Sequence, residues 1–138
     1  MKKILFIIFA IISCTKIYAQ EKQFILVETK VVKVNQANLS FEVGWQPSIK
    51  IKDDYYKDSK IIIGKSSLYT KAKIESDKKI KIWFKTVINN KLWDNFVFEK
   101  EAEFIDGVPE VFIEKKERED GTYDFYLIIV KGTIDRKH

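Results

Sequence analysis

Hydrophobic and polar residues alternate along most of the chain after residue 23, which is the pattern of β-strands that bury one face. Residues 24–34 are rich in β-branched side chains, and residues 39–45 alternate strictly after a polar break at residues 35–38. This arrangement predicts a strand, a turn and a second strand. Because proline cannot donate to a strand ladder, Gln46-Pro47 should end or kink the second strand, and residues 49–52 predict a short edge strand.

The middle of the chain is less regular. Asp53 to Lys60 is its most polar stretch and predicts a surface loop with room for one helical turn. Three isoleucines before Gly64 predict a short buried strand, and residues 69–75 predict a weaker one. Residues 79–85 then show the strongest two-faced pattern in the chain, so we expect their apolar side chains in the core.

Two registers are open for the hairpin that turns at Asn89-Asn90. A two-residue loop pairs Phe84 with Asn95, whereas a three-residue loop pairs Phe84 with Phe96 and keeps apolar side chains on one face. We favour the second register, because a slip of one residue moves every side chain of a strand to the wrong face.

The last hairpin, residues 109–134, has the clearest turn signal. Glu119-Asp120-Gly121 suits a type I turn followed by a positive φ at the glycine, which predicts a three-residue loop with a bulge. In that register Lys116 lies opposite Asp124, so opposite charges pair across the strands. One face then carries Val111, Ile113, Tyr123, Phe125, Leu127 and Ile129, and the other carries Phe112, Tyr126, Ile128 and Val130. We expect the hairpin to be central to the core, with the second face partly covered.

The fold class follows from these strands. No segment after residue 20 shows a sustained helical period, an internal repeat or a domain linker. Residues 20–138 therefore predict a single all-β domain of about eight strands, whose second half is a four-stranded antiparallel meander. An antiparallel β-sandwich is the first choice and a small β-barrel the alternative, because short, regularly spaced strands suit both.

Residues 1–19 follow a different pattern. Lys2 and Lys3 precede an apolar or small run from Ile4 to Ser13, and Ala19 offers a small residue at a cleavage position. This stretch resembles the secretory export signals of Gram-negative bacteria, and we interpret it as a signal peptide. The run is about ten residues long, short of the roughly twenty that span a bilayer. We therefore expect a mature chain without a transmembrane segment that is periplasmic, secreted or outer-membrane-associated.

The same stretch also permits a lipid anchor. Ile11-Ile12-Ser13-Cys14 resembles the lipobox of bacterial lipoproteins, in which the cysteine becomes the acylated first residue. Only one of the two cleavages can occur. Ordinary secretion is favoured, because Tyr18-Ala19-Gln20 suits signal cleavage and only a short tether separates Cys14 from the first predicted strand. Lipidation at Cys14 is the alternative.

Cleavage after Ala19 changes the charge and cysteine content. The full chain carries a net charge of +5, whereas the mature chain has 22 Lys and Arg against 20 Asp and Glu, a net of +2. A nearly balanced, interspersed surface argues against nucleic acid as a partner. The mature chain also lacks the only cysteine, so packing rather than a disulfide must stabilise it.

The sequence lacks the residues of several common active sites. Its single histidine is His138, and the mature chain has no cysteine, so Ser-His-Asp catalysis, Cys-His catalysis and His/Cys metal sites have no side chains to use. Its glycines are isolated, which argues against a phosphate-binding loop. We expect no cofactor and no enzymatic activity.

Acidic residues are candidates for two other chemistries. Glycoside hydrolysis needs two carboxylates about 5–9 Å apart, and candidates are Glu99, Glu101, Glu103 and Asp94. Calcium takes six to eight oxygen ligands, and candidates are Asp53, Asp54 and Asp58. Neutralisation by lysines and ordinary turn roles explain these sets better. We therefore expect no metal site, and a carboxylate-based glycosidase is the least favoured hypothesis.

Aromatic side chains are the candidates for binding. Tyr55 and Tyr56 lie in the polar stretch, where rings can stack on a sugar or anchor a protein partner. Trp83 lies on the lysine-bearing side of its predicted strand, and Trp93 follows the next turn. Core packing is the competing interpretation for these rings and for Trp45.

Our leading hypothesis is an exported, non-enzymatic β-sandwich of a bacterial envelope that binds a protein or glycan partner through its surface. Such a protein would be accessory, adhesin-like or inhibitor-like. The alternative is a small lipocalin-like barrel that holds an apolar ligand, which requires an interior not filled by side chains.

Overall fold

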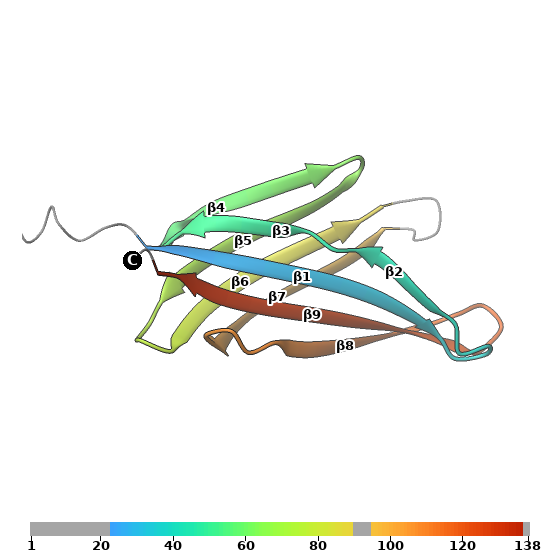
Figure 1. The fold of residues 1–138 in the computed structure, drawn as a ribbon. Helices are drawn as coiled ribbons and strands as arrows, with labels where there is room; N and C mark the ends of the chain where they lie inside the picture. The colour runs from blue at the N-terminus through green and yellow to red at the C-terminus, as the bar shows by residue number, and fades with distance from the viewer. Residues whose placement is uncertain (1–22, 90–94, 137–138) are drawn as a thin grey trace, which may run out of the picture.

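The computed structural model describes residues 23–89 and 95–136, which form strands in two antiparallel sheets (Figure 1). The strands are β1 (Phe24–Asn35), β2 (Phe41–Trp45), β3 (Ser48–Lys52), β4 (Asp54–Ile63), β5 (Ser66–Ile74), β6 (Lys79–Ile88), β7 (Phe96–Ile105), β8 (Glu110–Glu117) and β9 (Tyr123–Asp135). No helix within the described ranges is long and apolar enough to cross a membrane. The predicted all-β sandwich is confirmed.

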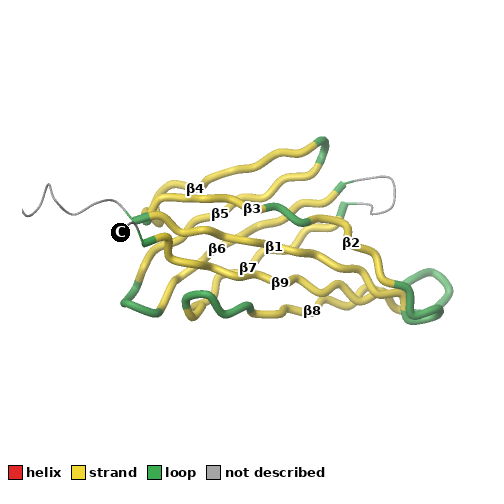
Figure 2. The backbone as a smooth tube through the Cα atoms, viewed as in Figure 1, coloured by secondary structure: helices red, strands yellow, loops and turns green. Residues whose placement is uncertain are grey.

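The first sheet has the order β2-β1-β9-β8, and β3 pairs with β1 as well (Figure 2). Residues 31–34 of β1 pair with β2, and residues 24–28 pair with β3. Between these two partners, the Thr29 amide donates a hydrogen bond to the Pro47 carbonyl at 3.0 Å. Gln46-Pro47 is thus confirmed as the place where the second strand ends, because β2 gives way there to β3.

The second sheet has the order β4-β5-β6-β7, and its edge strand β4 corrects two predictions. The polar stretch from Asp53 to Lys60 is mostly strand rather than a loop or a helical turn. An edge strand is paired on one side only, so it tolerates this polarity. Ile62 and Ile63 are 59% and 60% exposed, so the prediction that the isoleucines form a short buried strand is wrong.

The register of β6 and β7 differs from our prediction by four residues. Phe84 lies opposite Lys100, and Phe96 lies opposite Ile88 instead of Phe84. The connection runs from residue 89 to residue 95 and is therefore longer than the predicted three residues. A shift of four residues preserves the inward face, since side chains alternate with period two. The predicted burial of the apolar residues of β6 is accordingly confirmed.

The chain changes sheets between β7 and β8. Gly107 adopts a φ of 76°, and its amide donates a hydrogen bond of 2.8 Å to the Gly132 carbonyl in β9. The hairpin β6-β7 belongs to the second sheet, whereas β8-β9 belongs to the first. The predicted four-stranded meander is therefore wrong, because its two halves lie in opposite sheets.

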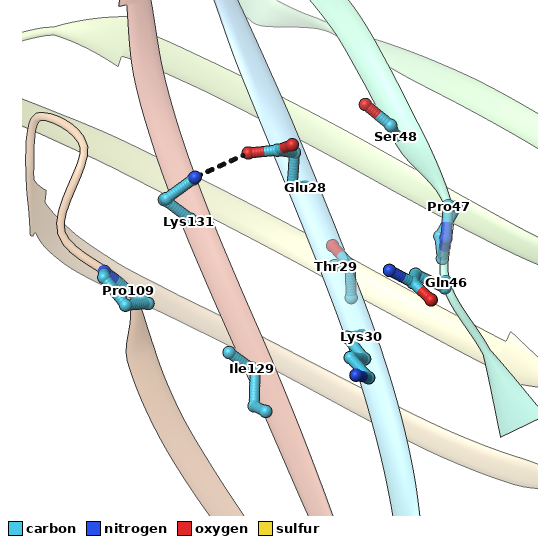
Figure 3. A pocket seen from close by; sticks show the side chains of 9 residues that line it. All are labelled: Glu28, Thr29, Lys30, Gln46, Pro47, Ser48, Pro109, Ile129 and Lys131. Carbon is cyan, nitrogen blue, oxygen red and sulfur yellow. Dashed lines mark ion pairs between the residues drawn. The ribbon is translucent and has the colours of Figure 1, made fainter. Parts of the chain in front are cut away.

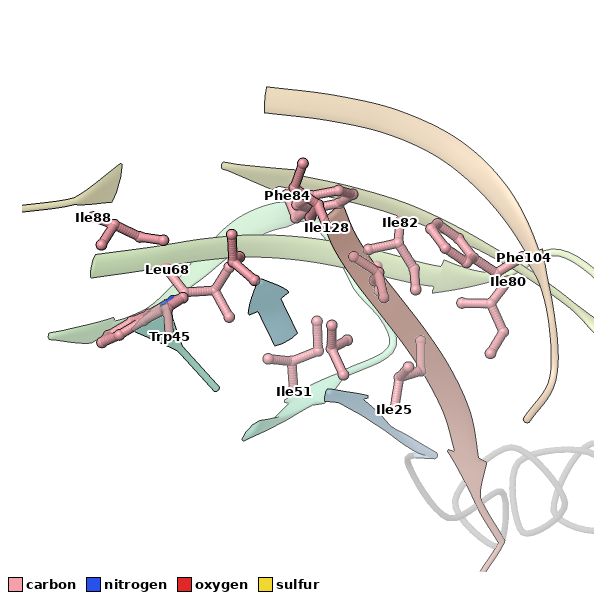
Figure 4. Packing of buried hydrophobic residues seen from close by; sticks show 14 of the residues in the cluster. Ile25, Trp45, Ile51, Leu68, Ile80, Ile82, Phe84, Ile88, Phe104 and Ile128 are labelled. Carbon is pink, nitrogen blue, oxygen red and sulfur yellow. The ribbon is translucent and has the colours of Figure 1, made fainter. Parts of the chain in front are cut away.

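The core lies between the two sheets (Figure 4). Side chains from both layers are fully buried there, among them Ile25, Val27, Leu68, Ile80, Ile82, Phe84, Ile88, Ile128 and Val130. The sheets approach closely at Gly132, where an added Cβ would lie 2.6 Å from the Ile82 Cδ1 atom. The architecture is two open sheets packed face to face, so the barrel alternative is wrong.

The last hairpin has the predicted register and the opposite orientation. The Arg118 amide donates to the Thr122 carbonyl at 2.7 Å, Gly121 has a φ of 85°, and Lys116 lies opposite Asp124. The core-facing residues are Phe112, Asp124, Tyr126, Ile128 and Val130. The face that we expected in the core points outward instead. β9 is central in its sheet, but β8 is an edge strand.

Candidate functional site

The outward surface of the second sheet combines lysines, glutamates and aromatic rings, and we call it the charged face. Trp83 on β6 donates a hydrogen bond from Nε1 to Glu99 Oε1 on β7 at 3.0 Å. The Lys71 ammonium lies 4.9 Å from the centroid of the Trp83 ring, a cation–π distance. Trp83 is half-buried among these partners rather than displayed or placed in the core.

Tyr55 joins the charged face from β4. Its hydroxyl donates a hydrogen bond to Glu101, and Lys81 Nζ lies 3.2 Å from the other carboxylate oxygen of Glu101. Burial and the hydrogen bond to Glu101 raise the pKa of Tyr55 to about 12. The hydrogen bonds from Tyr55 and Lys81 lower the pKa of Glu101 below its ordinary value. The cluster therefore holds a neutral phenol against a stable carboxylate.

The acidic residues of the charged face lie along an edge strand. Glu99, Glu101 and Glu103 alternate on the exposed side of β7, as the sequence predicts. Glu99 and Glu101 already accept hydrogen bonds from neighbouring side chains. This arrangement presents paired carboxylates on an open surface, which is the lysine-neutralised arrangement that we considered the better explanation.

The remaining predicted residues lie apart. Tyr56 is 96% exposed, and Trp45 is buried in the core. Asp53 Oδ1 accepts the Ile74 amide at 2.8 Å, and Asp54 Oδ1 accepts the Tyr56 amide at 3.0 Å. In the chain segments 23–89 and 95–136, no group of three acidic, histidine or cysteine side chains is placed to hold a metal ion. Cys14, Trp93, Asp94 and His138 lie outside the described residues.

The outward surface of the first sheet is different in kind, because apolar side chains cross it from edge to edge. The strand registers align one row of Val43, Val32, Leu127 and Ile113, a second row of Phe41, Val34 and Phe125, and a third that contains Ile129 and Val111. We call these nine residues the apolar strip. Neighbouring strands lie about 4.8 Å apart, so adjacent members of a row are in contact range.

Much of the apolar strip is open to solvent. Phe41 is 72% exposed, Ile113 67%, Val43 56% and Val111 54%. Val32, in the middle of the strip, is only 9% exposed, since Val43 and Leu127 flank it on the two neighbouring strands. A contiguous exposed apolar surface of this kind marks an interaction site more often than isolated apolar residues do.

A pocket of about 340 Å³ lies at one end of the apolar strip (Figure 3). Ile129 and Lys30 contribute to its lining, Pro109 stands on one side, and Gln46 and Ser48 stand on the other. Lys131 Nζ pairs with Glu28 Oε2 at 3.1 Å across β9 and β1. The pocket therefore joins a polar, charged rim to the apolar strip.

Sequence reasoning found part of the apolar strip but assigned it to the core. It grouped Val111, Ile113, Phe125, Leu127 and Ile129 on one face of the last hairpin, and the structure confirms that grouping. The signal for a second, external function was that both faces of β9 are apolar. A strand with two apolar faces predicts cover on both sides.

Comparisons with known proteins give a fold but no family. The sequence matches no protein-family model and no curated protein. The structure is similar to a cryo-EM structure of the T2SS secretin XcpQ from Pseudomonas aeruginosa, with a TM-score of 0.62 and 10% sequence identity. The similarity covers 94% of this chain and 63% of the secretin chain. At that identity the likeness shows a shared fold alone.

Proposed function

We propose that this protein is an exported, non-enzymatic binding domain of a bacterial envelope and that the apolar strip is its docking surface. The observation that carries the proposal is the unbroken apolar row across β2, β1, β9 and β8, whose two end residues are more than half exposed. Covering apolar surface yields about 25 cal/mol per Å² removed from water. The apolar strip is therefore the surface on which a partner would gain the most binding free energy.

The other parts of the proposal have separate support. The leader at residues 1–19 supports export, and the fold shared with a T2SS secretin supports an envelope location. The carboxylates of the charged face support a non-enzymatic role, because Glu99 and Glu101 are engaged by Trp83, Tyr55 and Lys81 on an open sheet.

Site-specific photo-crosslinking in the producing cells tests the docking surface. A photoreactive side chain at Ile113, on edge strand β8, should give a discrete crosslinked adduct. The same side chain at Val97, which is 48% exposed on edge strand β7 of the charged face, should give none. Adducts from position 97 alone, or from neither position, would contradict the proposal. So would a hydrolytic activity that disappears in Glu99→Gln or Glu101→Gln.

A further inference from the structure

The pocket beside the apolar strip carries an uncompensated positive charge. Three ionisable side chains line it, namely Glu28, Lys30 and Lys131. Glu28 and Lys131 neutralise each other at 3.1 Å. Lys30 forms no ion pair with any residue in the described part of the chain, and it is half-buried. An anionic group that entered the pocket would therefore find an available cation.

Neutral donors lie on one side of the same pocket. Gln46 and Ser48 are both exposed at the junction of β2 and β3, and the Gln46 side chain points toward β1 (Figure 3). A carboxylate accepts hydrogen bonds from an ammonium, an amide and a hydroxyl at once. The rim of the pocket thus matches a carboxylate better than a cation or a fully apolar group.

The pocket and the apolar strip share Ile129. Ile129 lines the pocket and lies opposite Val111, and Leu127 and Phe125 follow on the same face of β9. At about 3.3 Å per residue, the distance from Ile129 to Phe125 is roughly 13 Å. An extended alkyl chain that starts in the pocket would cover this length of apolar surface.

From this continuity we infer that the protein binds a free amphipathic carboxylate, such as a fatty acid, with its head in the pocket and its chain along the apolar strip. The inference rests on the proposed function, since it assigns a ligand class to the same surface. The volume of about 340 Å³ is at the lower end of the range for small-molecule sites. A second copy of the chain fits less well, because its strip offers Lys30 no anion.

Calorimetric titration of the purified protein with dodecanoate tests this inference. Two probes separate the contributions: dodecyl maltoside has the chain without the charge, and butyrate has the charge with a short chain. We expect dodecanoate to bind at least tenfold more tightly than either probe. Added salt should weaken binding of dodecanoate, because part of the attraction is between charges near the surface.

Two substitutions locate the site. Lys30→Gln removes the unpaired charge and should weaken dodecanoate binding about fivefold, as expected for one partly exposed ion pair. Lys52→Gln is the matched control, because Lys52 lies on the outward face of the same sheet and away from the strip. It should leave the affinity unchanged.

Three outcomes would overturn the inference: no binding of dodecanoate, equal affinities for dodecanoate and dodecyl maltoside, or equal losses in the two lysine variants. A protein adduct from position 113 without dodecanoate binding would refute the fatty acid and keep the docking surface. In that case the anion would belong to an acidic, apolar segment of a protein partner.

Discussion

Most outward positions on β6 and β7 carry Lys, Trp or Glu, and the exceptions are Val87, Val97 and Ile105. In contrast, the outward positions from Val111 to Ile113 on β8 and from Phe125 to Ile129 on β9 carry only Val, Ile, Leu and Phe. Inward and outward side chains therefore alternate equally well in both sheets, but the outward side chains differ in chemistry. On the charged face, Trp83 and Glu99 are partners, as are Tyr55 and Glu101. On the apolar strip, Phe41 and Ile113 remain open to solvent.

This difference indicates where binding free energy is available. A partner on the charged face would have to break existing hydrogen bonds and ion pairs. The new exposed ion pairs that it formed in exchange would contribute only about 0–1 kcal/mol each to the binding free energy. A partner on the apolar strip would displace water from apolar side chains that are more than half exposed, such as Phe41 and Ile113. The four predictions below test this contrast and the core that both faces share.

The largest effect is expected from the shared core. Phe84 on β6 is fully buried and contacts the rings of Phe98 and Phe112, with ring centroids 5.8 Å apart in both pairs. Phe84→Ala should lower the free energy of unfolding by about 3–5 kcal/mol, measured by chemical denaturation. Val97→Ala, on an exposed edge, should cost less than about 0.5 kcal/mol. A loss below about 1 kcal/mol for Phe84→Ala would mean that the sheets are not packed as described.

The next effect concerns the close approach of the sheets. Gly132→Ala would place a methyl group 2.6 Å from Ile82 Cδ1 and should cost about 1–3 kcal/mol by overpacking. Ile82→Val removes that Cδ1 atom, so the double variant should be more stable than the sum of the two single changes predicts. Strict additivity in denaturation experiments would contradict the contact between β9 and β6.

Local structure could be predicted from the sequence where the side chains strongly favoured one conformation. Gly121 could fix the turn of the last hairpin because a positive φ suits glycine, and the hydrogen bond between Arg118 and Thr122 confirms the register. The strict alternation of β6 likewise identified Ile82 and Phe84 as core residues. In both cases the alternative conformation would have been much higher in free energy.

The sequence could not decide between alternatives of similar quality. Both faces of β9 are apolar, so the pattern did not show that Ile128 points inward and Leu127 outward. Phe84 keeps its inward orientation whether it lies opposite Phe96 or Lys100, so face matching did not fix the length of the loop. The pocket unites residues from β1, β9 and the Gln46 segment, which only the fold brings together.

The third prediction concerns the ionisation of Tyr55 on the charged face. Its pKa is about 12, whereas an unfolded tyrosine ionises near 10. Because the raised pKa favours the protonated phenol in the fold, the stabilisation is complete below pH 10 and is lost between pH 10 and pH 12. The stability difference between the wild type and Tyr55→Phe should shrink over that range.

Removal of the carboxylate tests the cause of this shift. In Glu101→Gln the pKa of Tyr55 should fall but stay above its ordinary value, because burial, the largest cause, remains while the charge and the charged hydrogen-bond acceptor are gone. Spectrophotometric titration of tyrosinate absorbance, with Tyr55→Phe subtracted, measures the change. An unchanged titration curve in Glu101→Gln would mean that burial alone raises the pKa.

The smallest effect on stability, and the most direct comparison of the faces, comes from a matched pair of threonine substitutions. Ile113→Thr and Val97→Thr each replace an exposed β-branched residue on an edge strand, the first in the apolar strip and the second on the charged face. Threonine keeps the β-branched shape that suits a strand, so each change should alter the free energy of unfolding by less than about 0.5 kcal/mol.

The same pair should differ in the binding of a fluorescent apolar dye. Ile113 ends the row that contains Leu127 and Val32, so a hydroxyl there interrupts a continuous surface and should reduce the dye signal. Val97 has Val87 as its cross-strand neighbour, but the next pair on that face is Lys85 with Glu99. Its replacement should therefore leave the signal nearly unchanged. Equal losses in both variants would mean that apolar exposure, rather than its continuity across four strands, determines binding, and the contrast between the two faces would no longer identify a docking surface.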